Sequence, residues 1–347
     1  IKSMSKELIA AQGYQANVDR EVRLLTKLKH PHVAHMLCSF ETRDSLHLVL
    51  ELAEGGDLHT HLTQLGSLAE DHAAFVVGEI VTALEFLHQQ GVIFVDLKPE
   101  NVLLTASGHI QLADLASAYE TGQEAAAEGE SEAGVSRVGG TPEYMAPELL
   151  EEGTATLPSA ATDFWALGCL VHQLLTGRLP PFVVDTAGDV EAQKAKGTGK
   201  AKGKGKRTSA EADGAQGEGD GQHAHDKKAV HFAGSKRLCE EDLSENARDL
   251  CDKFLAQEPS QRLGVAGGYQ AIRDHAFLAA LQWEPPLCEQ KPPKASAGIV
   301  APERVAQWSR RRNSMLWSPM PQRYDLSEGE LPTVVEHPAE PAWDTAP

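Results

Sequence analysis

Apolar positions in the first part of the chain follow two different spacings. Between residues 18 and 28 they recur every three or four positions, which predicts a helix that His30 and Pro31 bring to an end. Residues 47–52 form instead a nearly continuous apolar run, which predicts a buried strand. This strand leads into Gly55 and Gly56, and the paired glycines predict a hinge between two lobes of the protein.

Three further helices are predicted in the rest of the chain, and all are rich in apolar residues. The longest begins at a capping box formed by Ser67 and Glu70 and ends at Gly91, a residue type that suits the position just after a helix. The other two cover residues 160–176 and 247–255. We therefore expect a mainly helical lobe with the longest helix at its centre.

Two short apolar runs between the helices predict the strands of a hairpin. They cover residues 102–104 and 110–112. Asp96 precedes the first strand and Asp114 follows the second, so both carboxylates are expected at the same end of the hairpin. Taken alone, Asp114 would be interpreted as a turn residue.

Two segments lack the apolar residues that a core requires. Residues 186–229 consist largely of Gly, Ala and charged residues, which predicts a disordered insertion. From residue 285 to residue 347 the composition becomes Pro-rich and predicts a tail. The basic run at 194–207 leaves open a contact with RNA or an acidic partner, against which a solvated linker is the simpler interpretation.

The composition narrows the class of protein without naming a function. With 347 residues, 41% of them hydrophobic, the chain can bury a large core. The net charge of -18 argues against a general nucleic-acid binder. The cysteines form no C-x-x-C pair, which favours free thiols over a metal site. Neither a signal peptide nor a run of about 18 apolar residues is present, so a cytoplasmic or nuclear protein is expected.

The residues with the clearest chemistry lie at 94–101, in the order Phe, Val, Asp, Leu, Lys, Pro, Glu, Asn. This run places a carboxylate, Asp96, close to an ammonium, Lys98, and an amide, Asn101. Phosphoryl transfer needs such a set: the carboxylate accepts or orients the proton of the attacking hydroxyl, the cation neutralises the phosphate, and the amide oxygen holds a metal ion. The run therefore predicts phosphoryl transfer.

Three further charged residues fit the same chemistry. Lys2 and Glu21 are spaced like a lysine–glutamate pair in which the glutamate holds the lysine ammonium against the α and β phosphates of a nucleotide. Asp114 would bind the metal ion on those phosphates. Singly, Lys2 and Glu21 would be ordinary surface charges, but the set favours the functional interpretation.

Several blocks of sequence, in this order, resemble the eukaryotic protein kinase family. They are residues 79–88, 96–101, 109–114, 140–148, 163–169 and 247–250. Within that family the chain is most similar to the AGC group, in particular to its phosphoinositide-dependent members. The resemblance extends from residue 1 to about residue 284, apart from the insertion.

The resemblance implies a fold of the α+β class, the two-lobed protein kinase fold with an incomplete small β-rich N-lobe and a mainly helical C-lobe. The N-lobe would cover residues 1–52, and the C-lobe residues 53–185 and 230–284. Glu148 and Arg262 are expected to form a structural ion pair, and Asp163 to hold the backbone of the catalytic loop.

The resemblance also implies a serine/threonine protein kinase that uses ATP and Mg²⁺, because Lys98 is the residue typical of that specificity. Protein substrates are expected, with other AGC kinases as candidates, and neither nucleic acid nor a transmembrane segment is expected. The implied catalytic residues are Asp96, Lys98 and Asn101. The implied nucleotide-binding residues are Lys2, Glu21, Glu51, Ala53, Asp57, Glu100, Asn101 and Asp114, with Asn101 and Asp114 as metal ligands.

The chain also departs from the family pattern. No glycine-rich loop precedes Lys2, which leaves open whether one lies upstream of Ile1. Val95 replaces an Arg that in many kinases pairs with a phosphate on the activation segment, and Arg137 occupies the usual site of that phosphate. We therefore expect this segment to be ordered without phosphorylation. These departures keep open the alternative of a pseudokinase or scaffold.

Asp114 is followed by Leu115 and Ala116, where the family has Phe and Gly. Leu115 keeps an apolar side chain that is expected to pack with Phe94, Leu25 and Met36 between the lobes. Ala116 adopts positive φ less readily than Gly, so we expect this segment to flip less easily.

Overall fold

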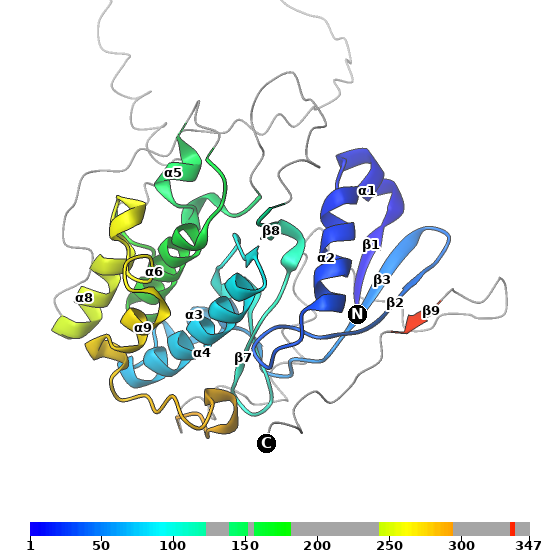
Figure 1. Cartoon of the computed structure of the whole chain (residues 1–347). Coiled ribbons are helices and arrows are strands. Elements are labelled where there is room, and N and C mark those ends of the chain that lie inside the picture. Colours follow the sequence, from blue (N-terminus) through cyan, green and yellow to red (C-terminus); the bar gives the residue numbers. More distant parts are fainter. Residues whose placement is uncertain (123–138, 152–155, 182–242, 294–333, 337–347) are drawn as a thin grey trace, which may run out of the picture.

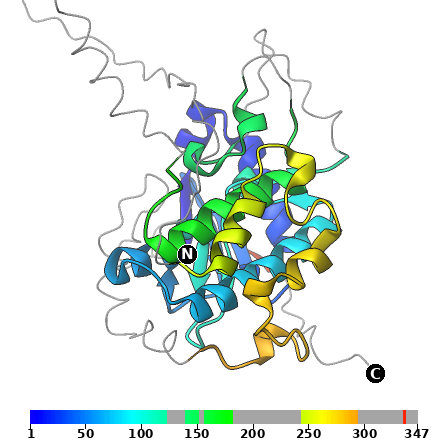
Figure 2. The same ribbon diagram turned by 90° about the vertical axis from the view of Figure 1, so that its left-hand side faces the viewer.

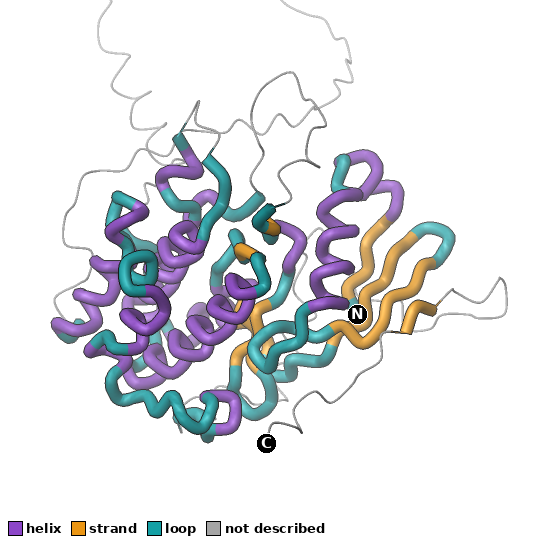
Figure 3. Tube along the Cα trace, viewed as in Figure 1, coloured by secondary structure: helices purple, strands orange, loops and turns teal. Residues whose placement is uncertain are grey.

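The computed structural model describes residues 1–122, 139–151, 156–181, 243–293 and 334–336, and these form two lobes (Figure 1). The longer strands gather in one lobe beside two helices, and most of the other helices gather in the second (Figure 3). The predicted two-lobed α+β fold is confirmed. Among the helices described, none is both long and apolar enough to cross a lipid bilayer.

The small lobe is an antiparallel sheet with two helices. Its strands are β1 (Lys2–Ser5), β2 (Met36–Glu41), β3 (Ser45–Leu50) and β9 (Val334–Glu336), in the order β1-β3-β2-β9, and its helices are α1 (Lys6–Gln12) and α2 (Gln15–Lys27). The predicted strand at 47–52 starts earlier and stops earlier than expected. It stops at Leu50, because its partner β2 begins at Met36, which is opposite Leu50. Glu51 therefore lies in the connection between the lobes.

The large lobe is built on two buried helices. Its helices are α3 (Leu58–Leu65), α4 (Glu70–Gln89), α5 (Pro147–Leu150), α6 (Ala160–Thr176), α8 (Glu245–Phe254) and α9 (Gly268–Arg273). Helix α6 packs between α4 and α8, as Figure 2 shows from the side. Its side chains are buried around most of its circumference, as expected for a helix that is apolar all round. Its bounds agree with the predicted 160–176, and Gly177 follows with φ 72°.

The predicted capping box at the start of α4 is wrong. The helix begins at Glu70 with Ala69 as its N-cap, and no side chain makes a capping hydrogen bond. The Glu70 carboxylate instead accepts a hydrogen bond from the amide of Ser244 at the start of α8, at 2.8 Å. A tertiary contact has therefore taken the carboxylate that Ser67 was expected to engage. At the other end of α4, Gly91 has φ 72°, as predicted.

Short strands and single 3₁₀ turns make up the rest of the large lobe, and some of them pack directly on its helices. The strands are β4 (Gly56–Asp57), β5 (Val92–Ile93), β6 (Val102–Leu104), β7 (Ile110–Leu112) and β8 (Tyr119–Glu120). The turns are η1 (Pro99–Asn101), η2 (Leu115–Ser117), η3 (Pro142–Tyr144), η4 (Pro259–Gln261), η5 (Ala276–Leu278) and η6 (Leu287–Glu289). Strands β6 and β7 pair as the predicted hairpin. Consequently η1 and η2, which flank the hairpin, lie at the same end of it.

The chain beyond residue 285, which was predicted as a tail, packs on the large lobe in its first residues. Leu287 in η6 is 2% exposed. Gly78 on α4 allows this contact, because a Cβ at that position would lie 2.6 Å from Leu281 and 3.0 Å from Leu287.

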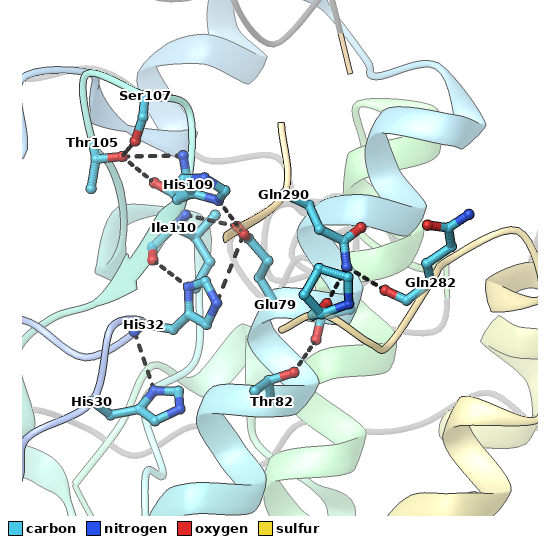
Figure 4. Close-up of polar contacts among 12 residues, drawn as sticks. His30, His32, Glu79, Thr82, Thr105, Ser107, His109, Ile110, Gln282 and Gln290 are labelled. Carbon is cyan, nitrogen blue, oxygen red and sulfur yellow. Dashed lines mark hydrogen bonds and ion pairs between the residues drawn. The ribbon is translucent and has the colours of Figure 1, made fainter. Parts of the chain in front are cut away.

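The loop between α2 and β2 joins the small lobe to the hairpin. The Leu112 amide donates to the His32 carbonyl at 2.9 Å, and the Ala34 amide donates to the Leu112 carbonyl at 2.8 Å. Below this loop, the fully buried Glu79 of α4 accepts a hydrogen bond from the Ile110 amide at 2.9 Å and contacts Nδ1 of His109 at 2.5 Å (Figure 4). A buried carboxylate needs such partners, and these two contacts join α4 to the hairpin. They fix the strand that leads to Asp114.

One histidine of this junction makes stability dependent on pH. The His30 ring stacks on Phe86 at 4.7 Å between centroids. Its Nδ1 accepts a hydrogen bond from the His32 amide at 3.2 Å (Figure 4). Burial lowers the pKa of His30 from 6.5 to about 4. Between these two values the unfolded chain binds a proton that the folded chain does not. The contribution of His30 to stability is therefore expected to fall as the pH drops from about 6.5 towards 4, by up to about 1.4 kcal/mol per pH unit.

Urea unfolding at several pH values measures this effect. In His30→Asn the amide oxygen replaces Nδ1 as acceptor, so the pH slope is expected to be smaller than in the unaltered chain. His59→Asn, at a half-exposed histidine, serves as the control. Equal slopes for His30→Asn and the unaltered chain would contradict this assignment.

Candidate active site

The loop before Asp96 is held by a buried aspartate from α6. The Asp163 carboxylate accepts hydrogen bonds from the amides of Phe94 and Val95, both at 2.8 Å, and its Oδ2 lies 2.7 Å from Nε2 of His88. Asp163 is fully buried, and a buried carboxylate with this many donors is rigid. The expectation that Asp163 holds the loop backbone is confirmed.

Val95 has an unusual backbone conformation, with φ 72°. A β-branched residue in the left-handed region is strained by roughly 1–3 kcal/mol. The hydrogen bond to Asp163 and the burial of the Val95 side chain hold it there. This backbone conformation leads into Asp96, the next residue, whose carboxylate contacts Lys98, Asn101 and Thr141.

Asp96 lies at the centre of a hydrogen-bond network. Its Oδ2 accepts from Nζ of Lys98 at 2.8 Å and from Nδ2 of Asn101 at 3.0 Å. Its Oδ1 accepts from the hydroxyl of Thr141 at 2.7 Å. The structure therefore brings together the three residues predicted to be catalytic, and it fixes both oxygens of the carboxylate.

Thr141 is a site residue that the sequence prediction missed. Its hydroxyl also accepts a hydrogen bond from Nζ of Lys98 at 2.6 Å, so it bridges Asp96 and Lys98. Thr141 lies just before η3, in the block 140–148, which contributed to the sequence analysis only as part of the family resemblance. The signal that could have found it is its position in the block 140–148, which the resemblance already included.

Asn101 and Asp114 lie on either side of the hairpin and suit a hard cation. Asn101 uses Nδ2 for its bonds to the carbonyl and carboxylate of Asp96, which leaves its amide oxygen to act as a ligand. The Ala113 amide donates to the Asn101 carbonyl at 2.9 Å, so Asp114 is nearby. The Asp114 side chain is 41% exposed, and oxygen ligands of this kind fit Mg²⁺.

Lys2, Glu21 and Asp114 form a single charged cluster between the lobes. Nζ of Lys2 contacts both carboxylate oxygens of Glu21, at 2.7 and 2.8 Å, and Oδ1 of Asp114 at 3.1 Å. Burial lowers the pKa of Lys2, but the two carboxylates outweigh it, so the pKa is raised and the ammonium stays charged. The predicted Lys2–Glu21 pair is present, and it lies next to the predicted metal ligand.

Three of the residues implied to bind the nucleotide, Glu51, Ala53 and Asp57, lie in the connection between the lobes or just after it. Glu51 and Ala53 follow β3 in irregular chain, and the Glu51 amide donates to the His35 carbonyl at 2.9 Å. Asp57 is the N-cap of α3, and its carboxylate accepts from both the amide and the hydroxyl of Thr60 at 2.9 Å. Asp57 is therefore already engaged in a cap, which the sequence prediction did not anticipate.

Glu100 lies in η1 with its Oε1 3.2 Å from Nδ1 of His59. Its other oxygen is buried and has no hydrogen-bond partner among the described residues. An unsatisfied buried oxygen beside the predicted nucleotide site marks Glu100 as a candidate contact for a ligand.

The apolar column between the lobes has the predicted members. Leu115 and Phe94 from the large lobe, and Leu25 and Met36 from the small lobe, are all buried in one core. Ala116 keeps negative φ, whereas Asp114 has φ 68°. Three predictions, on Arg137, the basic run 194–207 and the insertion 186–229, lie outside the described residues.

Comparison with known proteins agrees with this geometry. A model of the protein kinase domain matches residues 1–278. The chain is 31% identical to 3-phosphoinositide-dependent protein kinase 1 of Arabidopsis thaliana, over 88% of this chain and 54% of the relative. It is 31% identical to the Homo sapiens protein of that name, over 87% of this chain and 46% of the relative.

A third relative is RAC-beta serine/threonine-protein kinase B of Xenopus laevis, with 30% identity over 82% of this chain and 49% of the relative. The chain spans about half the length of these curated relatives. Because the protein kinase model covers most of its residues, and the charged cluster and the loop at Asp96 lie where that resemblance requires them, the chain belongs to the protein kinase family.

Proposed function

We propose that the chain transfers the γ-phosphate of ATP to a serine or threonine hydroxyl of protein substrates. The observation that carries this proposal is the three-membered cluster of Lys2, Glu21 and Asp114, with Asp96 and its partners at the same end of the hairpin. Taking an ammonium and its carboxylate partners out of water costs desolvation free energy, so a cluster of this kind suggests a function other than stability. An ammonium in this position suits a polyphosphate ligand.

Each residue has a distinct role in this proposal. Asp96 orients the substrate hydroxyl and accepts its proton, while Lys98 neutralises charge that develops on the transferred group. Lys2, kept in place by Glu21, contacts the α and β phosphates. Glu51 and Ala53 supply backbone groups to adenine, and Asp57 and Glu100 lie on the ribose side.

Asn101 and Asp114 would hold Mg²⁺, which when bound neutralises charge on the phosphates. Thr141 keeps Asp96 and Lys98 at a fixed separation before substrate arrives. Such preorganisation lowers the reorganisation required in the transition state.

Candidate substrates are other AGC kinases, and a cytoplasmic setting is proposed for the reaction. Two relatives are named as phosphoinositide-dependent kinases and one as a serine/threonine-protein kinase, which supports the class of reaction. A scaffold without transfer is the second candidate. It is favoured by Val95, which stands where many kinases have an Arg that pairs with a phosphate on the activation segment.

Replacing Lys2 separates the two functions. Lys2→Met is expected to lower kcat/KM for transfer to a peptide by about a hundredfold, because a charge-assisted contact to phosphate is lost. The measurement is incorporation of labelled γ-phosphate, in the presence of Mg²⁺, into a peptide that carries the sequence of an AGC activation segment. Lys6→Met is the matched control, since Lys6 pairs with Glu41 on the surface of the same lobe.

If the unaltered chain and both variants all incorporated labelled phosphate only at the background level, the proposed kinase activity would be contradicted. The scaffold function would then be the remaining candidate. Thermal unfolding of each variant shows whether lost transfer is instead lost folding, because Lys2→Met leaves the buried Glu21 without its cation.

A further inference from the structure

Helix α2 is attached to the chain that follows Asp114 by polar side chains on one of its faces. Nδ2 of Asn17 donates to the Ala116 carbonyl at 3.1 Å, and Nη1 of Arg20 donates to the same carbonyl at 3.3 Å. These two residues are three positions apart, so they lie on one face of the helix. Helix α2 is thus bound to the turn η2, directly after the predicted metal ligand.

One turn further along the same face, Arg23 reaches β8. Its Nη1 donates to Oε1 of Glu120 at 2.9 Å, and its Nη2 lies 2.5 Å from Oε2. The Arg23 side chain is 48% exposed, but that of Glu120 is only 11% exposed. The Nη1–Oε1 contact is a charge-assisted hydrogen bond, whereas Oε2 of Glu120 is buried and makes no hydrogen bond among the described residues. An exposed ion pair is usually weak, but a charge-assisted hydrogen bond to a largely buried carboxylate is stronger and directional.

The backbone of Glu120 is fixed to the strand that leads into the catalytic loop. In the register of β5 and β8, Glu120 pairs with Val92, and β5 ends two residues before Val95. The Arg23–Glu120 pair therefore connects α2 to the chain on both sides of the predicted catalytic centre. Glu21, the partner of Lys2, lies on α2 between Arg20 and Arg23.

These contacts indicate a structural role for the carboxylate of Glu120, which has no part in the proposed phosphoryl transfer. In kinases of this resemblance, an Arg at position 95 would hold a phosphate, but here that position is Val95 and supplies no charge. A phosphate carries about -1.5 to -2 charges and binds arginine in the same two-pronged way as a carboxylate. Glu120 offers one such acceptor permanently, at a site that α2 can reach.

We propose that Arg23 and Glu120 are positioning residues that hold α2, and through it Glu21, against Lys2 without phosphorylation of the activation segment. The proposal rests on the proposed kinase function for its catalytic consequence, but its structural part does not depend on it. Asn17 and Arg20 support the same placement through the Ala116 carbonyl.

The test compares Arg23→Gln and Glu120→Gln with Lys27→Gln, a control that removes a cation from the last turn of the same helix. Each of the first two variants is expected to lower kcat by about fivefold, the range of a modest ion pair. The exchanged pair Arg23→Glu with Glu120→Arg is expected to recover most of the loss. Phosphatase treatment of the unaltered chain should leave its kcat unchanged.

Hydrogen exchange of the α2 amides gives a readout that does not require catalysis. Faster exchange in Glu120→Gln than in Lys27→Gln supports the proposal, even if the unaltered chain transfers no phosphate and the proposed function fails. The proposal would be overturned if the α2 amides of Glu120→Gln exchanged hydrogen no faster than those of the unaltered chain. It would also be overturned if the double variant Arg23→Glu with Glu120→Arg recovered neither the slow hydrogen exchange of α2 nor kcat. A loss of kcat on phosphatase treatment would also overturn it.

Discussion

Asp96→Asn is expected to lower kcat for phosphoryl transfer by about 10²–10⁴-fold, the usual contribution of a positioned acid or base. The amide keeps the shape of the carboxylate and can still accept from the hydroxyl of Thr141. It cannot accept the proton of an incoming hydroxyl, and it leaves Lys98 without its charged partner at 2.8 Å. The loss should therefore fall on kcat, with little change in affinity for nucleotide.

Single-turnover transfer from Mg-ATP and nucleotide binding by calorimetry separate these two quantities. Asp71→Asn is a suitable control, because Asp71 is exposed in the first turn of α4 and lies outside the Asp96 network. If Asp96→Asn transferred phosphate as fast as Asp71→Asn, the role assigned to Asp96 would have to be abandoned. If the unaltered chain and both variants bound nucleotide but none of the three transferred phosphate, the scaffold function would be favoured.

Arg262→Ala is expected to reduce the free energy of unfolding by about 3–5 kcal/mol, the effect of breaking a buried ion pair. Arg262 is fully buried, and its Nη1 and Nη2 donate to the two oxygens of Glu148 at 2.6 and 2.7 Å. It also donates to the carbonyls of Ala256 and Ala161, at 2.9 and 3.0 Å. Its guanidinium lies over the Trp165 ring at 5.0 Å. Truncation therefore leaves a carboxylate and several carbonyls without their donor.

Equilibrium unfolding in urea measures the change, with Lys253→Ala as control. Lys253 pairs with Asp249 one turn away on α8, and both side chains are about half exposed, so its loss should cost no more than about 0.5 kcal/mol. A double variant, Arg262→Met with Glu148→Met, removes both charges together and should be less destabilised than Arg262→Ala. A loss in Arg262→Ala no larger than in Lys253→Ala would show that the pair is not structural.

Elements with strong local signals could be predicted from the sequence. Helix α6 has the predicted bounds because it is apolar throughout and stops at a glycine, which adopts the left-handed conformation at little cost. The hairpin of β6 and β7 was predicted because each strand is a short apolar run. Local patterns were not sufficient for the start of α4, where Glu70 bonds to Ser244 rather than to Ser67.

The site shows the same division. The residues of the charged cluster were predicted, because the family pattern names Lys2, Glu21 and Asp114 by residue type and order. The bridge made by Thr141 and the capping role of Asp57 were missed. Both depend on where a hydroxyl or amide from another element arrives, which no local pattern contains.

By itself, the sequence determined which charges are available and which segments are helical, since both follow from residue types and short spacings. Only the tertiary structure decided which charges meet. Lys2 and Asp114 are 112 positions apart and Arg262 and Glu148 are 114 apart, and at such separations a contact is set by how helices and strands pack. The contact of Arg23 with Glu120, 97 positions away, is of the same kind. Packing brings these groups out of water and close together, and there charge and geometry decide the pairing.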